Sequence, residues 1–230
     1  MGQAEPIFTL ETFRFFRDLA KNNKKVWMDA NRERYQEHVV RPFRRLLEEM
    51  SQPVLELDER FDTTGRSGAN FSRINRDIRF AKDKTPYRPQ MYLKFCVPFP
   101  GEGETGELYA GLSKDTVTAG FRIYGGKRKV SALAVIADPR LAARPKWLTE
   151  QKKKLGPKYE SYWYAAEKKE WKQRDGWPAN AEEFKKLQGW IVRKKLKPAD
   201  ATKAVFASTV TKIFRDVYPL LKFTCLDDED

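Results

Sequence analysis

The sequence predicts an α+β fold, and three observations lead to this prediction. The first fifty residues repeat apolar side chains at helical spacing, residues 91–125 alternate as strands do, and the C-terminal part reads as mostly helical. The expected architecture is an N-terminal helical pair, a central antiparallel sheet at about 91–125, and C-terminal helices packed on one sheet face. With 230 residues, 40% of them hydrophobic, the chain is expected to form a single domain over residues 1–230.

The predicted N-terminal pair consists of two helices of unequal length. Thr9 is placed to cap the first helix, which is expected to end at Asn22-Asn23. The second helix is expected to run from about residue 24 to residue 50. Pro42 is expected to kink or split this helix, because proline has no N–H to give to the helical ladder.

The predicted sheet begins with MYLKFCVPF at 91–99, in which apolar and other residues alternate cleanly. Residues 107–113 and 116–125 are two further strand candidates, joined tightly around Lys114-Asp115. Such short connections predict an antiparallel meander. The sequence has no strand, glycine-rich turn and helix in succession, so it contains no dinucleotide-binding or Walker phosphate loop.

Beyond the sheet the sequence predicts mainly helices. They are expected at 148–155, 181–192 and about 199–217, with Pro219 after the last; the apolar run 130–137 belongs to the same part. Aromatic residues alternate with lysines at 156–178, a pattern that could stack nucleic-acid bases. The same pattern also fits aromatic side chains packed beneath a lysine-covered exterior, and this second interpretation is preferred.

The net charge of +13 favours anionic partners. A small phosphorylated or carboxylate ligand is one candidate; non-specific, salt-dependent nucleic-acid binding is another, because no base-reading motif is present. No apolar run approaches the ~20 residues that cross a bilayer, so no membrane partner is expected. The sequence leaves the oligomeric state open.

The residues for several common chemistries are missing. His38 is the only histidine, which excludes Ser-His-Asp and Cys-His arrangements and multi-histidine metal sites. Cys96 and Cys225 lie far apart without paired spacing, which predicts passive thiols in a reduced, cytoplasmic protein. No metal and no cofactor are expected.

The stretch RINRDIRFAKDK at 73–84 is the candidate site. Read as a helix over 71–81, it places apolar residues on one face and arginines beside an aspartate on another. Arg73 and Asp77 are four residues apart, so an ion pair between them is expected to hold the guanidinium in a fixed orientation. A guanidinium held in this way can bind a phosphate or carboxylate by donating two hydrogen bonds to it.

The same stretch resembles the signature of a known family. The pattern Arg73-x2-Arg76-Asp77-x-Arg79-Phe80-x3-Lys84-x2-Tyr87 is similar to that of a bacterial family of conserved hypothetical proteins, classed as a domain of unknown function. The segments 22–35, 108–126 and 190–223 also resemble blocks of that family, in the same order. The resemblance implies a single domain and singles out the same residues, but it implies no activity.

Three roles for these residues remain open. In the first, Arg73, Arg76, Asp77, Arg79, Lys84 and Tyr87 bind an anionic ligand. In the second, the protein is an enzyme that acts on a phosphorylated substrate, with Asp77 as base, Lys84 or Tyr87 as acid and the arginines as charge stabilisers. In the third, the cluster is an internal ion-pair network in a structural or partner-binding protein.

Overall fold

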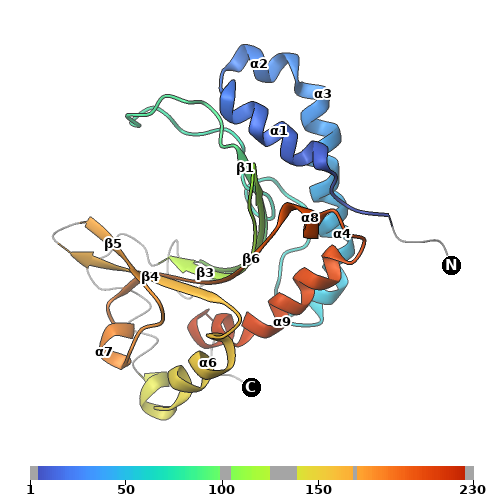
Figure 1. Cartoon of the computed structure of the whole chain (residues 1–230). Coiled ribbons are helices and arrows are strands. Elements are labelled where there is room, and N and C mark those ends of the chain that lie inside the picture. Colours follow the sequence, from blue (N-terminus) through green and yellow to red (C-terminus); the bar gives the residue numbers. More distant parts are fainter. Residues whose placement is uncertain (1–4, 99–104, 125–138, 168–169, 226–230) are drawn as a thin grey trace. The chain divides into compact units, whose positions relative to one another are not determined.

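The computed structural model describes residues 5–98, 105–124, 139–167 and 170–225 (Figure 1). The chain divides into two compact units. Unit 1 comprises Met1–Phe95, Ala110–Thr118 and Leu196–Lys212, and unit 2 comprises Cys96–Tyr109, Ala119–Lys195 and Ile213–Asp230. The single domain expected from the sequence stays a prediction.

The α+β class is confirmed. Six strands form an antiparallel sheet in the order β1-β2-β3-β6-β4-β5, and the C-terminal helix packs on it. The strands are β1 (Gln90–Pro98), β2 (Thr105–Ser113), β3 (Val117–Tyr124), β4 (Glu160–Glu167), β5 (Glu170–Asp175) and β6 (Leu187–Leu196). The first three are the strands that the alternating sequence predicts.

The N-terminal helices belong to unit 1. They are α1 (Leu10–Lys21), α2 (Lys25–Ala30), α3 (Arg32–Tyr35), the π-helical turn η1 (Gln36–Val40) and α4 (Arg41–Leu55). Thr9 occupies the N-cap position of α1, although its side chain makes no capping hydrogen bond. The predicted second helix is therefore a series of shorter segments, and Pro42 lies in the first turn of α4, where a missing N–H costs least.

The core of unit 1 is rich in phenylalanine. Phe8 is fully buried and packs edge-on against Phe43 of α4, with ring centroids 5.1 Å apart. It packs in the same way against Phe206, at 5.7 Å. Phe15 of α1 lies 5.5 Å from Tyr35, which fixes α1 against α3. These aromatic contacts hold the helices that form one wall of the pocket described below.

The C-terminal half contains more strand than the sequence predicts. The expected helix at 181–192 is wrong, because only α7 (Ala181–Phe184) is helical and β6 follows it. β6 lies between β3 and β4 and is buried from Leu187 to Val192, so it lacks the alternation that marks a half-buried strand. Residues 156–178 likewise contain the hairpin of β4 and β5.

The remaining helices agree better with expectation. The helix predicted at 148–155 is confirmed as α6 (Trp147–Leu155). The predicted final helix is replaced by α8 (Pro198–Ala201) and α9 (Phe206–Cys225), and Pro219 lies inside α9 instead of after it. The apolar run 130–137 lies outside the described residues.

Candidate functional site

Residues 71–81 do not form the expected helix. The start of this stretch pairs over long range instead: Ser72 N donates to Tyr92 O at 3.0 Å, and Phe71 forms a bridge with Leu93 of β1. The spacing of Phe71 and Ile74 is compatible with a helix, yet both side chains are buried without one. The backbone groups that a helix would use are taken by these longer-range partners.

Residues 74–88 form a projecting loop closed at its base. Arg88 N donates to Ile74 O and Arg76 N donates to Pro86 O, both at 2.8 Å. The side chain of Asn23 then clamps the returning chain, since Asn23 Nδ2 donates to Tyr87 O at 2.8 Å and Tyr87 N donates to Asn23 Oδ1 at 3.0 Å. Tyr87 is 7% exposed, so the structure gives it a buried place at the base of the loop.

Most charges on this loop are paired within it. Both oxygens of Asp77 accept hydrogen bonds from Arg79, from Nε at 3.0 Å and from Nη2 at 2.7 Å. Arg79 thereby lowers the pKa of the Asp77 carboxyl below its ordinary value. Asp77 pairs with Arg79, so the predicted ion pair between Asp77 and Arg73 is wrong. Asp77 Oδ1 also accepts from the backbone N–H of Arg79 at 3.2 Å, so this spacing of two residues belongs to a local turn and not to a helix.

Arg76 and Lys84 also have partners in the loop. Arg76 Nη1 binds the carboxylate of Asp83 and the hydroxyl of Thr85. The backbone N–H of Thr85, helped by Arg76, lowers the pKa of Asp83 to about 2. Lys84 Nζ donates to the carbonyl of Ile78 at 3.0 Å. These contacts tie the loop together and leave fewer donors for a ligand.

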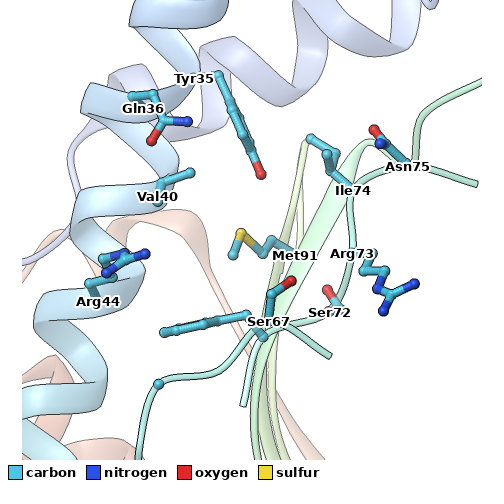
Figure 2. Close-up of a pocket in the computed structure, with 12 residues that line it drawn as sticks. Tyr35, Gln36, Val40, Arg44, Ser67, Ser72, Arg73, Ile74, Asn75 and Met91 are labelled. Carbon is cyan, nitrogen blue, oxygen red and sulfur yellow. The ribbon is translucent and has the colours of Figure 1, made fainter. Parts of the chain in front are cut away.

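Arg73 differs from the other loop arginines because it lines a pocket. This pocket of unit 1 has a volume of about 350 Å³ and lies between the helical segment 35–44 and residues 65–75, with Met91 of β1. Its lining residues are Tyr35, Gln36, Val40, Arg44, Gly65, Ser67, Phe71, Ser72, Arg73, Ile74, Asn75 and Met91. Figure 2 shows Arg44 on the helical side and Arg73 on the opposite side. Of the six residues singled out from the sequence, Arg73 alone is in this lining set.

The pocket is electrostatically unbalanced. Neither Arg44 nor Arg73 has a hydrogen bond or ion pair to any described residue, and no acidic side chain is among the residues that line the pocket. Both guanidinium groups belong to exposed residues, so they lie where a ligand from solvent would enter. A Cβ at Gly68 would lie 3.7 Å from Arg73 Nη2, which places this guanidinium beside the turn at 65–70.

The pocket also offers neutral donors above an apolar floor. Burial raises the pKa of Tyr35 above its ordinary value, so its hydroxyl stays protonated at neutral pH and can donate a hydrogen bond. In Figure 2 this hydroxyl points toward the space between Val40 and Ile74. Ser67, Ser72 and Asn75 line the pocket as further polar residues. The lining can therefore hold a charged group at its rim and an apolar body below.

The helical wall has an unusual backbone. Gln36 and Val40, which both line the pocket, are the first and last residues of the π-helical turn η1. Such turns are rare in helices and occur frequently at functional sites. Pro42 follows closely and gives a local reason for the turn, because its ring disfavours a regular helix in the residues just before it.

Sequence reasoning missed Arg44, Tyr35 and Gln36 as site residues. Arg44 stands in the run RPFRRLL, where nothing in the pattern separates it from Arg41 or Arg45. Arg41 pairs with Glu37 and Arg45 with Glu49, whereas Arg44 lines the pocket. The proximity of Pro42 was the one available signal that this part of the helix is irregular.

The thiols and possible metal ligands add no further site. Neither Cys96 nor Cys225 is in a disulfide, and burial raises the pKa of Cys225 to about 12, which keeps it protonated. Within the described ranges, no group of three or more His, Cys, Asp and Glu side chains is placed to hold a metal ion. No helix in the same ranges is long and apolar enough to cross a membrane.

The fold and the pocket define an α+β protein with an arginine-rimmed cavity in its N-terminal unit. The chain belongs to the conserved hypothetical protein family DUF2461, whose family model matches residues 11–223. This match confirms the resemblance stated from the sequence. A comparison with curated proteins finds no significant match.

Proposed function

We propose that the protein binds a small phosphate- or carboxylate-bearing molecule in the pocket of unit 1. The observation that carries this proposal is the pair of unpartnered arginines, Arg44 and Arg73, on a pocket lined by no acidic side chain. An anion there would gain charge-assisted hydrogen bonds without displacing an existing partner. Other arginines of the predicted site would first have to give up a carboxylate.

The size and lining of the pocket support a small organic anion. A volume of about 350 Å³ falls at the lower end of the range for ligand pockets. Val40, Phe71 and Met91 supply apolar surface for the body of such a ligand. Tyr35 and the lining serines can then fix its orientation through hydrogen bonds.

The pocket favours binding over acid–base catalysis. Its described lining contains no carboxylate and no imidazole, and the residues assigned as base and acid in the enzyme alternative, Asp77, Lys84 and Tyr87, are not in it. The other interpretation of the sequence, an enzyme that acts on a phosphorylated substrate, is kept as the alternative to this proposal. We also propose, as the sequence predicted, that the protein is cytoplasmic.

The test is a thermal-shift titration with sodium phosphate and, separately, with citrate, against sodium chloride at matched ionic strength. A ligand that binds only the folded state raises the melting temperature with its concentration. We expect a phosphate- or citrate-specific rise for the wild type, and its loss in Arg44→Gln and in Arg73→Gln.

Two variants sharpen the result. Arg41→Gln removes the same charge from the same helix at a residue outside the pocket, so its anion response should match the wild type. Arg79→Gln tests the loop cluster, and loss of the response there with retention in Arg73→Gln would move the site to the loop. Equal shifts in chloride and in both anions would exclude the pocket as an anion site.

Non-specific nucleic-acid binding is the second candidate, and the net charge of +13 favours it. Counterion release makes such binding weaken steeply with salt, roughly 10³–10⁵-fold between 50 and 200 mM when 6–10 phosphates are contacted. An affinity measured across that range for two unrelated duplexes tests it. Affinity that is insensitive to salt, or that differs strongly between the two duplexes, would contradict it.

A further inference from the structure

One face of the sheet in unit 2 presents a row of aromatic side chains. Tyr124 of β3 lies 6.4 Å from Tyr164 of β4, and Tyr164 lies 6.2 Å from Trp171 of β5, measured between ring centroids. The planes of successive rings differ by 36° and 37°. Tyr124 is 39% exposed and Trp171 is 43% exposed, so both ends of this aromatic row are open to solvent.

A glycine makes the row continuous. β6 lies between β3 and β4, and its residue opposite Tyr164 is Gly189. A Cβ on Gly189 would lie 2.9 Å from Cδ1 of Tyr124 and 3.4 Å from Cδ2 of Tyr164. The missing side chain thus lets the two rings approach each other over the backbone of β6.

The opposite face of the same strands is the core of unit 2. Trp190, the residue after Gly189, is fully buried and packs edge-on against Phe121, Trp177 and Phe184 at 5.4–5.8 Å. Trp163, next to Tyr164, is 3% exposed. Successive strand residues point to opposite faces, so the aromatic row faces away from this core. Figure 1 shows α6 and α7 together on one side of β4 and β6.

Packing in the core of unit 2 therefore does not explain why these aromatic side chains form an exposed row. A packing role accounts for Trp163 and Trp190, but Tyr124 and Trp171 keep more than a third of their surface in water. The preference drawn from the sequence, that aromatics at 156–178 pack beneath the exterior, holds for Trp163 and not for Trp171. Exposed aromatic rings on neighbouring strands, with helices behind the sheet, are the arrangement on which unstacked bases are bound.

The charge of this segment favours a polyanion over a neutral partner. Residues 119–195, which supply β4 and β5 with most of β3 and β6, contain 20 Lys and Arg against 8 Asp and Glu. On the aromatic face itself Glu160 pairs with both Arg193, at 3.3 Å, and Lys195, at 3.1 Å. Glu160 can neutralise only one of these two cations. Arg193 Nη1 also donates to the hydroxyl of Tyr162 at 3.1 Å.

We propose that this face binds single-stranded nucleic acid by stacking bases on Tyr124, Tyr164 and Trp171, with Arg193 and Lys195 beside the phosphates. The site lies in unit 2 and is independent of the anion pocket of unit 1. Stacking on rings is tolerant of sequence because every base has a flat face. A duplex keeps its bases stacked inside and gains only the electrostatic contacts.

The test uses fluorescence anisotropy with a labelled oligothymidylate of roughly 15 nucleotides, within the site sizes known for single-strand binders. Loss of one stacking residue should weaken binding about 5- to 100-fold. We expect this loss in Tyr124→Ala and in Trp171→Ala at moderate salt, while Trp171→Phe stays close to the wild type. Binding to a duplex of the same length should be weaker than to the single strand.

Phe80→Ala is the matched control, because Phe80 is 95% exposed in unit 1 and far along the chain from the aromatic row. It should leave oligothymidylate binding unchanged. Melting curves for each variant separate lost stacking from lost folding, and Trp171 on the edge strand β5 is the variant least able to disturb the fold. Three results would overturn the proposal: no wild-type binding near 50 mM salt, full binding by Trp171→Ala and Tyr124→Ala, or displacement of the oligonucleotide by a neutral oligosaccharide.

Discussion

The buried hydroxyl of Thr12 donates a hydrogen bond to the backbone carbonyl of His38, with an oxygen–oxygen distance of 2.7 Å. His38 stands four residues before Pro42, which has no N–H to return to that carbonyl. Thr12 on α1 thus replaces a donor that the helix itself cannot supply. The contact joins α1 to the π-helical turn that forms one wall of the pocket.

Thr12→Val should lower the free energy of unfolding by about 1–3 kcal/mol, because it leaves a buried carbonyl without this donor while keeping the side-chain shape. Urea denaturation measures the change. Thr211→Val is the matched control: Thr211 is also buried, but its hydroxyl bonds to Ala207 O inside α9, where the helix already provides a donor. Equal losses in the two variants would show that the carbonyl of His38 does not depend on Thr12.

Asp77→Asn should leave the melting temperature unchanged within error. The pair of Asp77 and Arg79 is exposed on both sides, with 62% and 77% of the side-chain surfaces open, and exposed ion pairs contribute little. The ion pair with Arg73 that the sequence predicted would have made Asp77 an anchor for that guanidinium, so that loss of its charge would lower stability. A clear drop in the melting temperature of Asp77→Asn would restore that expectation.

Acid should weaken unit 1 through two aspartates whose pKa values are low in the folded state. Hydrogen bonds from Thr64 and Arg66 lower the pKa of Asp62 to about 2, and those from Thr85 and Arg76 lower that of Asp83 to about 2, against 3.8 for an unperturbed aspartate. A lowered folded-state pKa stabilises the protein above pH 3.8, and this contribution is lost as the pH falls toward 2.

Melting temperatures measured between pH 5 and pH 2 check this expectation. The double variant Asp62→Asn/Asp83→Asn should show a flatter decline than the wild type between about pH 4 and pH 2. Both side chains are accessible to solvent, so the difference should be small and should shrink at high salt. Parallel curves at low salt would mean that neither pair contributes.

How much the sequence predicts depends on how locally each element is determined. β1 is recognisable because Met91, Leu93 and Phe95 alternate with less buried neighbours, and a half-buried strand needs nothing else. β6 is not, because burial on both faces removes the alternation, and the run from Leu187 to Val192 then fits a helix equally well. Its place between β3 and β4 depends on pairing with strands that are distant in the sequence.

The candidate site shows the same limit. The arginines of residues 73–79 are visible as a cluster, but which of them have partners depends on a loop that closes through Asn23, more than 60 residues away. Arg44 comes to the pocket from the helix α4, far from this loop in the sequence, and has no distinguishing sequence pattern. Composition and spacing can therefore identify a charged segment. Which of its arginines lack a carboxylate partner, and so can bind a ligand, depends on tertiary contacts.

Gly120→Ala should destabilise unit 2 strongly. Gly120 lies in β3, and a Cβ there would stand 2.2 Å from the carbonyl oxygen of Val192 and 2.6 Å from Cα of Arg193, both backbone atoms of the neighbouring strand β6. Backbone in the middle of a sheet cannot move aside without breaking ladder hydrogen bonds. The loss should reach the upper end of the ~1–3 kcal/mol typical of overpacking, or exceed it.

Gly189→Ala gives the comparison that isolates the cause. Its added methyl group would be less crowded by backbone, because the nearest backbone atom is the carbonyl oxygen of Ile123 at 3.2 Å. Its nearest contact is Tyr124 Cδ1 at 2.9 Å, and that ring is 39% exposed and can rotate outward. Gly120→Ala should therefore lower the urea midpoint clearly more than Gly189→Ala, although both variants add one methyl group to the same sheet. If the two midpoints fall equally, backbone crowding at Val192 is not what selects glycine at position 120. A larger fall in Gly189→Ala would instead mean that the ring of Tyr124 and the carbonyl of Ile123 are both fixed in place, so that neither gives way to the added methyl group.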